Sequence, residues 1–334
     1  MKYSAEEKFL LDACVLSKPV LSGGYDASRL DWEKIVSSAE GHWLGFYLDK
    51  IIKTHRLKIE NKYLKRIGRL KERERARHSY YRRKLPVILR ALNKAKVNYV
   101  LLKGGYLAFK LFPAGARFLS DIDILVQKED KAKAEEALFK KGFKEDKNKS
   151  TKVTTVLNDV NGLEVDLDTE LGILKKILPA EELLQNTVKL RLLGEKAPVL
   201  NHEYNLLHLA LHTSMTHSFY NISKLVDINE YLKKYKVDMA RLEAIARQKG
   251  VFRAAFLPVA FTGILWHNKT GLSYNIEHKR ARYFIKYNLR NALKRGYDSR
   301  SAFYGYVIPV LLADSFELKF RLIKDYIVKK VKLA

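Results

Sequence analysis

Two aspartates separated by a single residue stand in a segment that otherwise has the composition of a buried β-strand. The segment from Arg117 to Val126 reads RFLSDIDILV. Successive side chains of a strand point to opposite faces, so Asp121 and Asp123 share one face while the isoleucines enter the core. Two carboxylates roughly 7 Å apart repel each other, and a divalent cation bound by oxygen ligands relieves the repulsion. The pair therefore predicts a site for Mg²⁺.

A second acidic strand, Glu164 to Asp168, offers a third carboxylate. Alternation places Glu164, Asp166 and Asp168 on one face of this strand. Phosphoryl or nucleotidyl transfer uses such a group as a metal ligand and as a base for the attacking hydroxyl. Asp166, flanked by Val165 and Leu167, is the favoured third carboxylate, and Asp168 is the alternative.

Lys103, Gly104 and Gly105 follow an expected strand and precede an expected helix. Glycines let the backbone approach phosphates closely, and the start of a helix offers free N–H groups and a positive dipole end. With the acidic pair one element later, this order suits a nucleoside triphosphate. We expect Lys103 and Arg117 to neutralise the triphosphate, and the alternative is that either one pairs structurally with Asp121.

Composition sets the class of protein. The chain has 334 residues, a hydrophobic content of 47% and a formal net charge of +26. Its length predicts two or three domains, and its charge predicts a polyanionic partner, nucleic acid first, unless the basic excess only reflects a Lys-rich proteome. The single cysteine, Cys14, excludes an intramolecular disulfide framework. Without a signal-like or membrane-spanning apolar run, we expect a cytoplasmic protein and no membrane partner.

Helical patterns flank a central region where helices and strands alternate. Ser4 and Asp31 are expected to begin helices, and residues 22–25 to end one. Asn161-Gly162 predicts a β-hairpin between two strands. The expected strands are 97–102, the Asp121 segment, 152–157 and 163–168, and the expected later helices include 202–217, 222–235 and 238–250. We predict an α+β fold with a mixed β-sheet, divided into an N-terminal helical region 1–85, a core 86–200 and a C-terminal helical domain 201–334.

Basic residues concentrate between Asn61 and Lys84, where helical spacing aligns a stripe of Lys62, Arg66, Arg69, Arg73 and Arg77. The stripe is either a solvated helix face or a surface that follows the phosphates of a nucleic acid. Further basic runs lie at 279–294 and 319–332.

Four of the nine histidines, His202, His208, His212 and His217, fall in one short segment. His208 and His212 are four residues apart on one helix face, a spacing that suits a metal, but no third ligand stands at a diagnostic distance. The other readings are a lining of the nucleotide or acceptor pocket and buried histidines that hydrogen-bond within the core.

These motifs together resemble the uncharacterised nucleotidyltransferase family of the DNA polymerase β-like superfamily. The residues that carry the resemblance are LLKGG at 101–105, Arg117 with DIDILV at 121–126, KGF at 141–143 and HEYNLLHLALH at 202–212. The likeness extends from about residue 30 to about 260. It implies a nucleotidyltransferase core with Asp121 and Asp123 as Mg²⁺ ligands, Asp166 as third carboxylate and the two glycines at the triphosphate. The sequence departs from the family pattern in a longer gap before Asp121 and in Asp168, where a histidine is expected.

The leading hypothesis is therefore an enzyme that transfers a nucleoside monophosphate from a nucleoside triphosphate to an acceptor. Asp121 and Asp123 would bridge two Mg²⁺ ions, and Asp166 would hold one of them. The basic charge favours RNA, tRNA above all, as acceptor, with protein next and a small sugar or antibiotic third. The alternative is a non-catalytic RNA-binding module, or a toxin–antitoxin component, with the same fold.

Overall fold

The computed structural model describes residues 3–15, 26–219, 221–266 and 308–331. Its contacts define two compact units: residues 74–205, named the sheet unit, and residues 1–73 with 206–334, named the helical unit. The expected helix end at 22–25 and the basic run at 279–294 lie outside the described residues. The division into domains at residues 85 and 200 stays a prediction, because compactness alone does not define independently folding parts.

The sheet unit contains a five-stranded sheet in the order β1-β2-β5-β4-β3 and a two-stranded sheet, β6-β7. β2 and β5 run parallel and the other neighbours run antiparallel. The predicted α+β class with a mixed sheet is confirmed. The strands are β1 Tyr99–Leu101, β2 Asp121–Val126, β3 Lys144–Glu145, β4 Thr154–Asn158, β5 Glu164–Asp168, β6 Thr187–Leu192 and β7 Glu195–Leu200.

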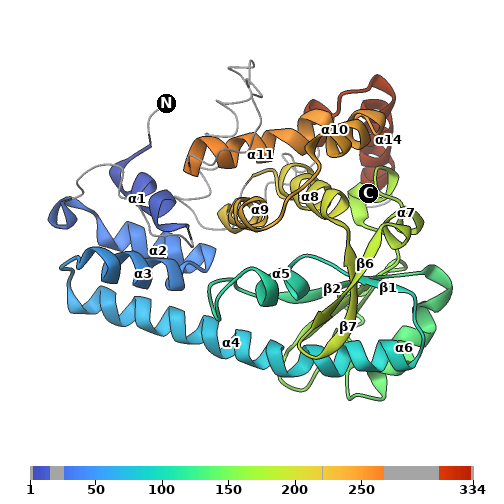
Figure 1. Cartoon of the computed structure of the whole chain (residues 1–334), viewed down its shortest axis with the longest axis horizontal. Helices are drawn as coiled ribbons and strands as arrows, with labels where there is room; N and C mark the ends of the chain where they lie inside the picture. Colours follow the sequence, from blue (N-terminus) through green and yellow to red (C-terminus); the bar gives the residue numbers. More distant parts are fainter. Residues whose placement is uncertain (1–2, 16–25, 220, 267–307, 332–334) are drawn as a thin grey trace. The chain divides into compact units, whose positions relative to one another are not determined.

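Helices cover one face of the five-stranded sheet. A Cβ atom on Gly105 of α5 would lie 3.4 Å from Cγ2 of Ile122, so α5 packs on that face of β2 (Figure 1). Thr155, which pairs with Leu167, donates a hydrogen bond to Glu135 of α6 at 2.6 Å, so α6 packs on the same face. The aspartates of β2 and β5 alternate with these residues and point to the other face. The helices are α5 Gly104–Lys110, α6 Lys131–Phe139 and α7 Ala180–Gln185, with 3₁₀ turns at Lys128–Asp130 and Gly172–Lys176.

Helix α4, Asn61–Lys94, is continuous through Pro86, whereas the sequence predicted that the N-terminal helical region ends at residue 85. A proline inside a helix removes one backbone hydrogen bond. Buried side chains recur every three or four residues on both sides of it, namely Tyr81, Leu85, Ile88 and Leu92. Packing of this stripe therefore outweighs the local cost, because most helical stability in proteins comes from a buried apolar face.

Two hairpins with short turns occur in the sheet unit. The predicted hairpin at Asn161-Gly162 is confirmed, since it joins β4 to β5, and Gly162 has φ +74°. The β6-β7 hairpin was not predicted. Its two turn residues, Leu193 and Gly194, have φ +50° and +91°, a conformation that usually selects Asn or Asp before Gly. Because Leu193 stands at the turn position where Asn or Asp is usual, the sequence gives no signal for this turn.

The helical unit begins with a capped helix. In α1 the Glu7 amide donates to Ser4 Oγ at 3.2 Å, and the Ser4 amide donates to Glu7 Oε2 at 2.8 Å. Asp31 caps α2 by accepting from the Lys34 amide at 3.1 Å. Both predicted helix starts are confirmed. The unit holds α1 Ala5–Ala13, a 3₁₀ turn Ala27–Arg29, α2 Trp32–His42, α3 Gly45–His55, the first part of α4, most of α8 His202–Leu211, a π-helical turn His212–Thr216, α9 Ile222–Lys234, α10 Met239–Gln248, α11 Phe252–Trp266 and α14 Phe316–Val331. None of the described helices combines the length and apolar character that crossing a membrane requires.

Candidate active site

The parallel register of β2 and β5 gathers the carboxylates predicted from the sequence. Asp121 pairs with Glu164, and Asp123 pairs with Asp166. One carboxylate oxygen each from Asp121, Glu164 and Asp166 lies within 4.8 Å of the other two. Among the described residues, this is the one group of three or more acidic, histidine or cysteine side chains with such spacing. The two strands thus form an acidic face in the sheet unit.

Asp166 fits a metal ligand by its surroundings. Its Oδ1 atom is buried, and no hydrogen-bond donor among the described residues reaches it. Burial, with the charges of Asp121 and Asp123 added to it, raises the pKa of Asp166 to about 7. A buried oxygen without a donor, beside other carboxylates, is stabilised by a cation, and an all-oxygen set suits Mg²⁺ or Mn²⁺. The residues present therefore fit a hard divalent ion.

Asp168, the alternative third carboxylate, lies outside this cluster. It pairs in register with Leu125, two positions beyond Asp166, and accepts a hydrogen bond from Thr154 Oγ1 at 2.5 Å. Burial raises its pKa to about 6, although the Thr154 bond favours the ionised form. The geometry brings Asp166, and not Asp168, together with Asp121.

Asp123 is paired with a cation of the chain itself. Lys103 Nζ donates to Asp123 Oδ1 at 2.6 Å, and the exposed fractions of the two side chains are 16% and 7%. Burial alone would lower the pKa of Lys103, but the charges of Asp123 and Asp121 outweigh it and raise that pKa. The structural pairing considered for Lys103 thus occurs, but with Asp123 rather than with Asp121.

The backbone of Lys103 is unusual. Its φ and ψ are +43° and −124°, a region that glycine occupies without strain and other residues rarely enter. Strain of this kind costs roughly 1 to 3 kcal/mol and occurs often at functional sites. The turn that carries Lys103 therefore holds its side chain toward β2 at the expense of local stability.

The two glycines lie close to neighbouring side chains. A Cβ on Gly104 would lie 2.4 Å from Arg117 Nη1, and one on Gly105 would lie 2.7 Å from Leu101 Cδ1. Arg117 is buried against Gly104 and donates from Nη1 to the Phe118 carbonyl at 3.2 Å. Close packing thus explains the glycines, and their predicted role at a triphosphate stays a prediction.

Helix α4 holds the chain just before the acidic strand. Arg77 Nη2 donates to the Ser120 carbonyl at 2.6 Å, and the Tyr81 hydroxyl donates to the same oxygen at 2.8 Å. Arg77 also donates to the Leu119 carbonyl. These contacts fix the backbone that leads into Asp121, so Arg77 acts as a structural residue rather than as a member of a free basic stripe.

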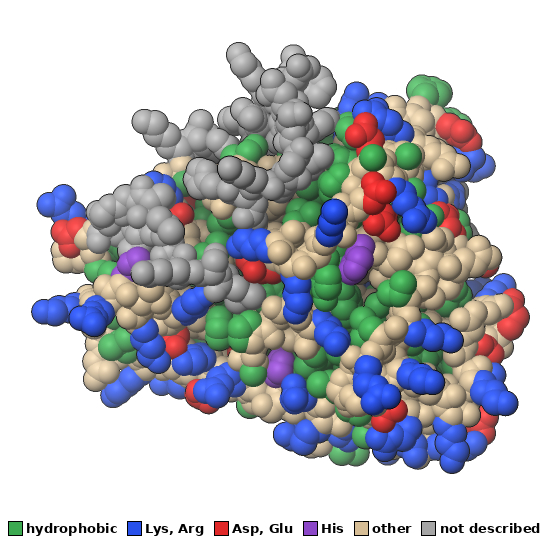
Figure 2. All heavy atoms as spheres, in the orientation of Figure 1, with side chains coloured by type: hydrophobic (Ala, Val, Ile, Leu, Met, Phe, Trp, Pro, Cys, Tyr) green, Lys and Arg blue, Asp and Glu red, His purple; other side chains and the backbone are tan. Residues whose placement is uncertain are grey.

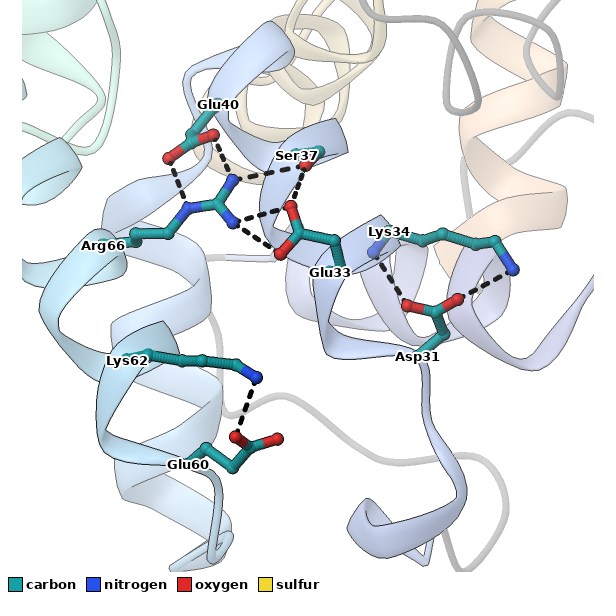
Figure 3. A network of polar contacts seen from close by, with 8 residues as sticks. All are labelled: Asp31, Glu33, Lys34, Ser37, Glu40, Glu60, Lys62 and Arg66. Atoms are coloured by element: carbon teal, nitrogen blue, oxygen red, sulfur yellow. Dashed lines mark hydrogen bonds and ion pairs between the residues drawn. The ribbon is translucent and has the colours of Figure 1, made fainter.

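Other members of the predicted stripe also have partners inside the helical unit. Arg66 donates from Nη1 to both carboxylate oxygens of Glu33, at 2.7 and 2.8 Å, and from Nη2 to Glu40 at 2.7 Å and Ser37 at 3.2 Å. Figure 3 shows the guanidinium enclosed by these side chains, with Lys62 of the same helix paired to Glu60, the residue just before the helix.

The partnering continues along the helix. Arg73 lies over the ring of Trp43, 4.3 Å from its centroid, and Lys71 pairs with Asp49 at 2.5 Å. Lys65 and Arg69 are exposed and form no ion pair with the described residues. Figure 2 shows Lys and Arg side chains over much of the visible face rather than along one stripe. Only part of the predicted stripe is thus available to phosphates.

The histidine cluster lies in the helical unit, apart from His202, which belongs to the sheet unit. His208 and His212 are buried, with exposed fractions of 1% and 8%. Nε2 of His217 lies 2.9 Å from Nε2 of His212, across the π-helical turn. None of these histidines belongs to a three-ligand group among the described residues, so the hypothesis that they bind a metal ion gains no support.

Two residues at the acidic face, Glu164 and Lys149, were not predicted as site residues from the sequence. Glu164 lies in the cluster, and strand alternation had placed it on the right face, but only the register shows that it lies opposite Asp121. Lys149, from the loop before β4, forms an ion pair with Glu164. No sequence signal marked Lys149, because a loop lysine has no periodicity.

The comparison with family models agrees with the motifs. A family model described as uncharacterised nucleotidyltransferase matches residues 28–266, close to the extent of the resemblance seen in the sequence. Among solved structures, the chain is similar to an antigenic nucleotidyltransferase-like protein from Paracoccidioides brasiliensis, with 14% identity and a TM-score of 0.38 over 56% of this chain and 97% of that chain. None of the curated proteins matches this chain.

Proposed function

Because the chain belongs to the uncharacterised nucleotidyltransferase family, we propose that its sheet unit transfers a nucleoside monophosphate from a nucleoside triphosphate to an acceptor hydroxyl. One observation supports this most directly. Asp121, Glu164 and Asp166 bring carboxylate oxygens within 4.8 Å of one another, and a buried oxygen of Asp166 has no donor among the described residues. Such a set suits a divalent ion that meets substrate phosphates.

Each residue of the acidic face has a proposed role. Asp121, Glu164 and Asp166 would hold a divalent ion, which neutralises phosphate charge and activates the acceptor when bound. Asp166 also suits a base for the acceptor hydroxyl, since its buried Oδ1 accepts no hydrogen bond from the described residues. A second ion would require Asp123, whose Oδ1 accepts from Lys103. Lys103 would then move from Asp123 to the departing pyrophosphate as a point charge.

We propose RNA, tRNA first, as the acceptor, with protein as the second candidate. The net charge of +26 supports a polyanionic partner. Binding through phosphates releases counterions, so the affinity is expected to fall steeply as salt rises. Binding that does not change with salt would contradict an RNA acceptor held by charge.

The test is labelling of total RNA and of protein by each of the four α-labelled nucleoside triphosphates in the presence of Mg²⁺. The wild-type chain should label one of the two acceptors, and Asp121→Asn with Asp166→Asn should not. Glu181→Gln is the matched control, because Glu181 is an exposed carboxylate of α7 in the same unit. Full labelling by the double variant would overturn the proposal.

A non-catalytic RNA-binding module, or a toxin–antitoxin component, is the second candidate. The observation that favours it is Lys103, because an ammonium held on Asp123 is also what a site without a second metal would contain. The melting temperature separates the two candidates. A live nucleotide site predicts stabilisation by Mg²⁺ with a nucleoside triphosphate, by mass action, and a non-catalytic module predicts no shift with any of the four.

A further inference from the structure

Lys149 approaches the acidic face from outside the strands. It stands in the loop between β3 and β4, and its ammonium pairs with Oε2 of Glu164. The loop is ordered: the amides of Lys149 and Ser150 donate to the Asp146 carbonyl at 3.1 and 2.9 Å, and the Val156 amide donates to Ser150 Oγ at 3.1 Å. The backbone therefore presents Lys149 to the rim of the acidic face.

The carboxylate of Glu164 is placed to meet two cations that compete for it. Glu164 belongs to the group whose oxygens are spaced for a metal ion, and Lys149 occupies one of its oxygens. An ammonium group and a divalent ion repel each other when they share one carboxylate. Metal binding through Glu164 is therefore favoured when Lys149 moves away.

Release of Lys149 from Glu164 requires little free energy. Its side chain is 55% exposed, and an exposed ion pair contributes little to stability because solvent screens it. Lys103 differs in each respect, since it is largely buried and carried by a strained turn. A half-exposed lysine on a flexible stem is thus the more easily released cation of this face, and Lys103 is the more firmly held one.

We propose that Lys149 is a positioning residue that leaves Glu164 when the metal binds and then contacts the outer phosphates of the nucleoside triphosphate. The inference rests on the proposed function, because it assumes that the acidic face holds a metal with a nucleotide. A released ammonium beside a metal site meets the phosphate oxygens of the nucleotide, for which lysine acts as a point charge. Lys149 thereby opposes the free metal and favours the metal with its nucleotide.

The proposal predicts two effects of opposite sign in Lys149→Met. Without nucleotide, Mn²⁺ should bind about two- to fivefold more tightly, because its competitor for Glu164 is gone. With Mn²⁺ present, a non-hydrolysable nucleoside triphosphate should bind about three- to tenfold more weakly, since one charge-assisted contact is lost. Calorimetry measures both affinities on the full chain without turnover.

Lys147→Met is the matched control. Lys147 is exposed in the same loop and forms no ion pair with the described residues, so its loss changes the net charge equally. It should leave both affinities within about twofold, because screened charges contribute little. Lys149→Arg should keep both affinities near the wild-type values.

The outcomes distinguish this proposal from the proposed function on which it rests. If Lys149→Met leaves Mn²⁺ affinity or nucleotide affinity unchanged, or changes both in the same direction, the role of Lys149 is wrong while the metal site stands. If the wild-type chain binds no Mn²⁺, and Asp121→Asn changes nothing, the proposed function fails and the role of Lys149 fails with it.

Discussion

Lys103 and Asp123 form a largely buried ion pair, with Nζ 2.6 Å from Oδ1, at the turn between β1 and α5. The pair supplies Asp123 with a cation from the chain itself. It also ties the turn that contains Gly104 to the strand that carries the carboxylates, so the charge balance of the acidic face and the stability of the sheet unit depend on the same contact.

Replacing Lys103 by Met should destabilise the chain and increase its response to Mg²⁺. Removal of one partner from a buried pair leaves the other charge uncompensated, at a cost of roughly 3 kcal/mol. Added Mg²⁺ should restore part of this loss by neutralising the carboxylates. Urea denaturation with and without excess Mg²⁺ measures both effects.

The control for that experiment is Lys175→Met. Lys175 and Glu170 pair in the same unit, but their side chains are 47% and 41% exposed, so its loss should change the unfolding free energy by less than about 1 kcal/mol. An equal response to Mg²⁺ in Lys103→Met and in the wild-type chain would contradict the predicted compensation.

Gly115→Ala should destabilise more than Gly142→Ala. Both glycines have φ +84°, so alanine strains both backbones by about 1 kcal/mol. A Cβ on Gly115 would also lie 2.6 Å from Arg75 Cγ and 3.3 Å from Arg75 Cα in α4, whereas nothing lies within 4 Å of a Cβ on Gly142. We expect a total of roughly 3 kcal/mol at Gly115 by urea denaturation, the excess arising from overpacking. Equal losses of unfolding free energy in the two variants would show that α4 shifts without a free-energy penalty.

Asp159 should make the sheet unit sensitive to acid. It accepts hydrogen bonds from the amides of Asn161 and Leu163, at 2.9 and 3.0 Å, and from Tyr80, and it pairs with Lys84 at 3.1 Å. Burial alone would raise the pKa of Asp159, but these contacts outweigh it and lower that pKa below its ordinary value.

A lowered pKa in the folded state means that the contribution of Asp159 is complete above the unfolded value, about 3.9, and is lost as pH falls through the folded value. At neutral pH, Asp159→Asn should cost about 2 kcal/mol, because bonds to a charged acceptor are stronger than bonds to an amide. The difference between wild type and Asp159→Asn should shrink below about pH 4. A difference that is constant from pH 7 to pH 3 in urea denaturation would be inconsistent with this ionisation.

RNA binding, if it uses α4, should depend on Lys65 and Arg69 and not on Arg66. Lys65 and Arg69 are exposed without ion pairs among the described residues, whereas Arg66 is held by Glu33 and Glu40. Replacing Lys65 and Arg69 by Gln should reduce the slope of log affinity against log salt by about 2.

Arg66→Gln is the comparison for that measurement. It should lower stability by about 1 kcal/mol while leaving the salt dependence of RNA binding unchanged, because the guanidinium of Arg66 is already paired with Glu33 and Glu40. A loss of salt dependence in Arg66→Gln alone would show that the Glu33 and Glu40 pairs open on binding.

Much of the site follows from local rules in the sequence. Strand alternation placed Asp121, Asp123 and Asp166 on shared faces, and the Asn161-Gly162 signal placed the strand of Asp166 in a hairpin. Neither rule fixes the partner strand. That Glu164 lies opposite Asp121, and that Asp166 rather than Asp168 joins the cluster, depends on the parallel register of β2 with β5.

The remaining features depend on tertiary packing. The pairing of Lys103 with Asp123 needs a turn with positive φ that no local preference of lysine predicts. The continuity of α4 through Pro86 depends on buried side chains from the rest of the sheet unit. Local propensity is overridden at these two places, so neither was visible in the sequence.

The parallel pairing of β2 with β5 also determines at which stage of folding the acidic face forms. Asp121 stands at the start of one strand and Glu164 at the start of another, with α6, β3 and β4 between them in the chain. Contacts this distant in sequence form late in folding, because closing the intervening chain costs entropy before the contacts stabilise it. A chain whose synthesis stops before Asp166 would lack part of the carboxylate cluster. Affinity for a divalent ion should therefore report completed folding of the sheet unit, and serve as a probe of it.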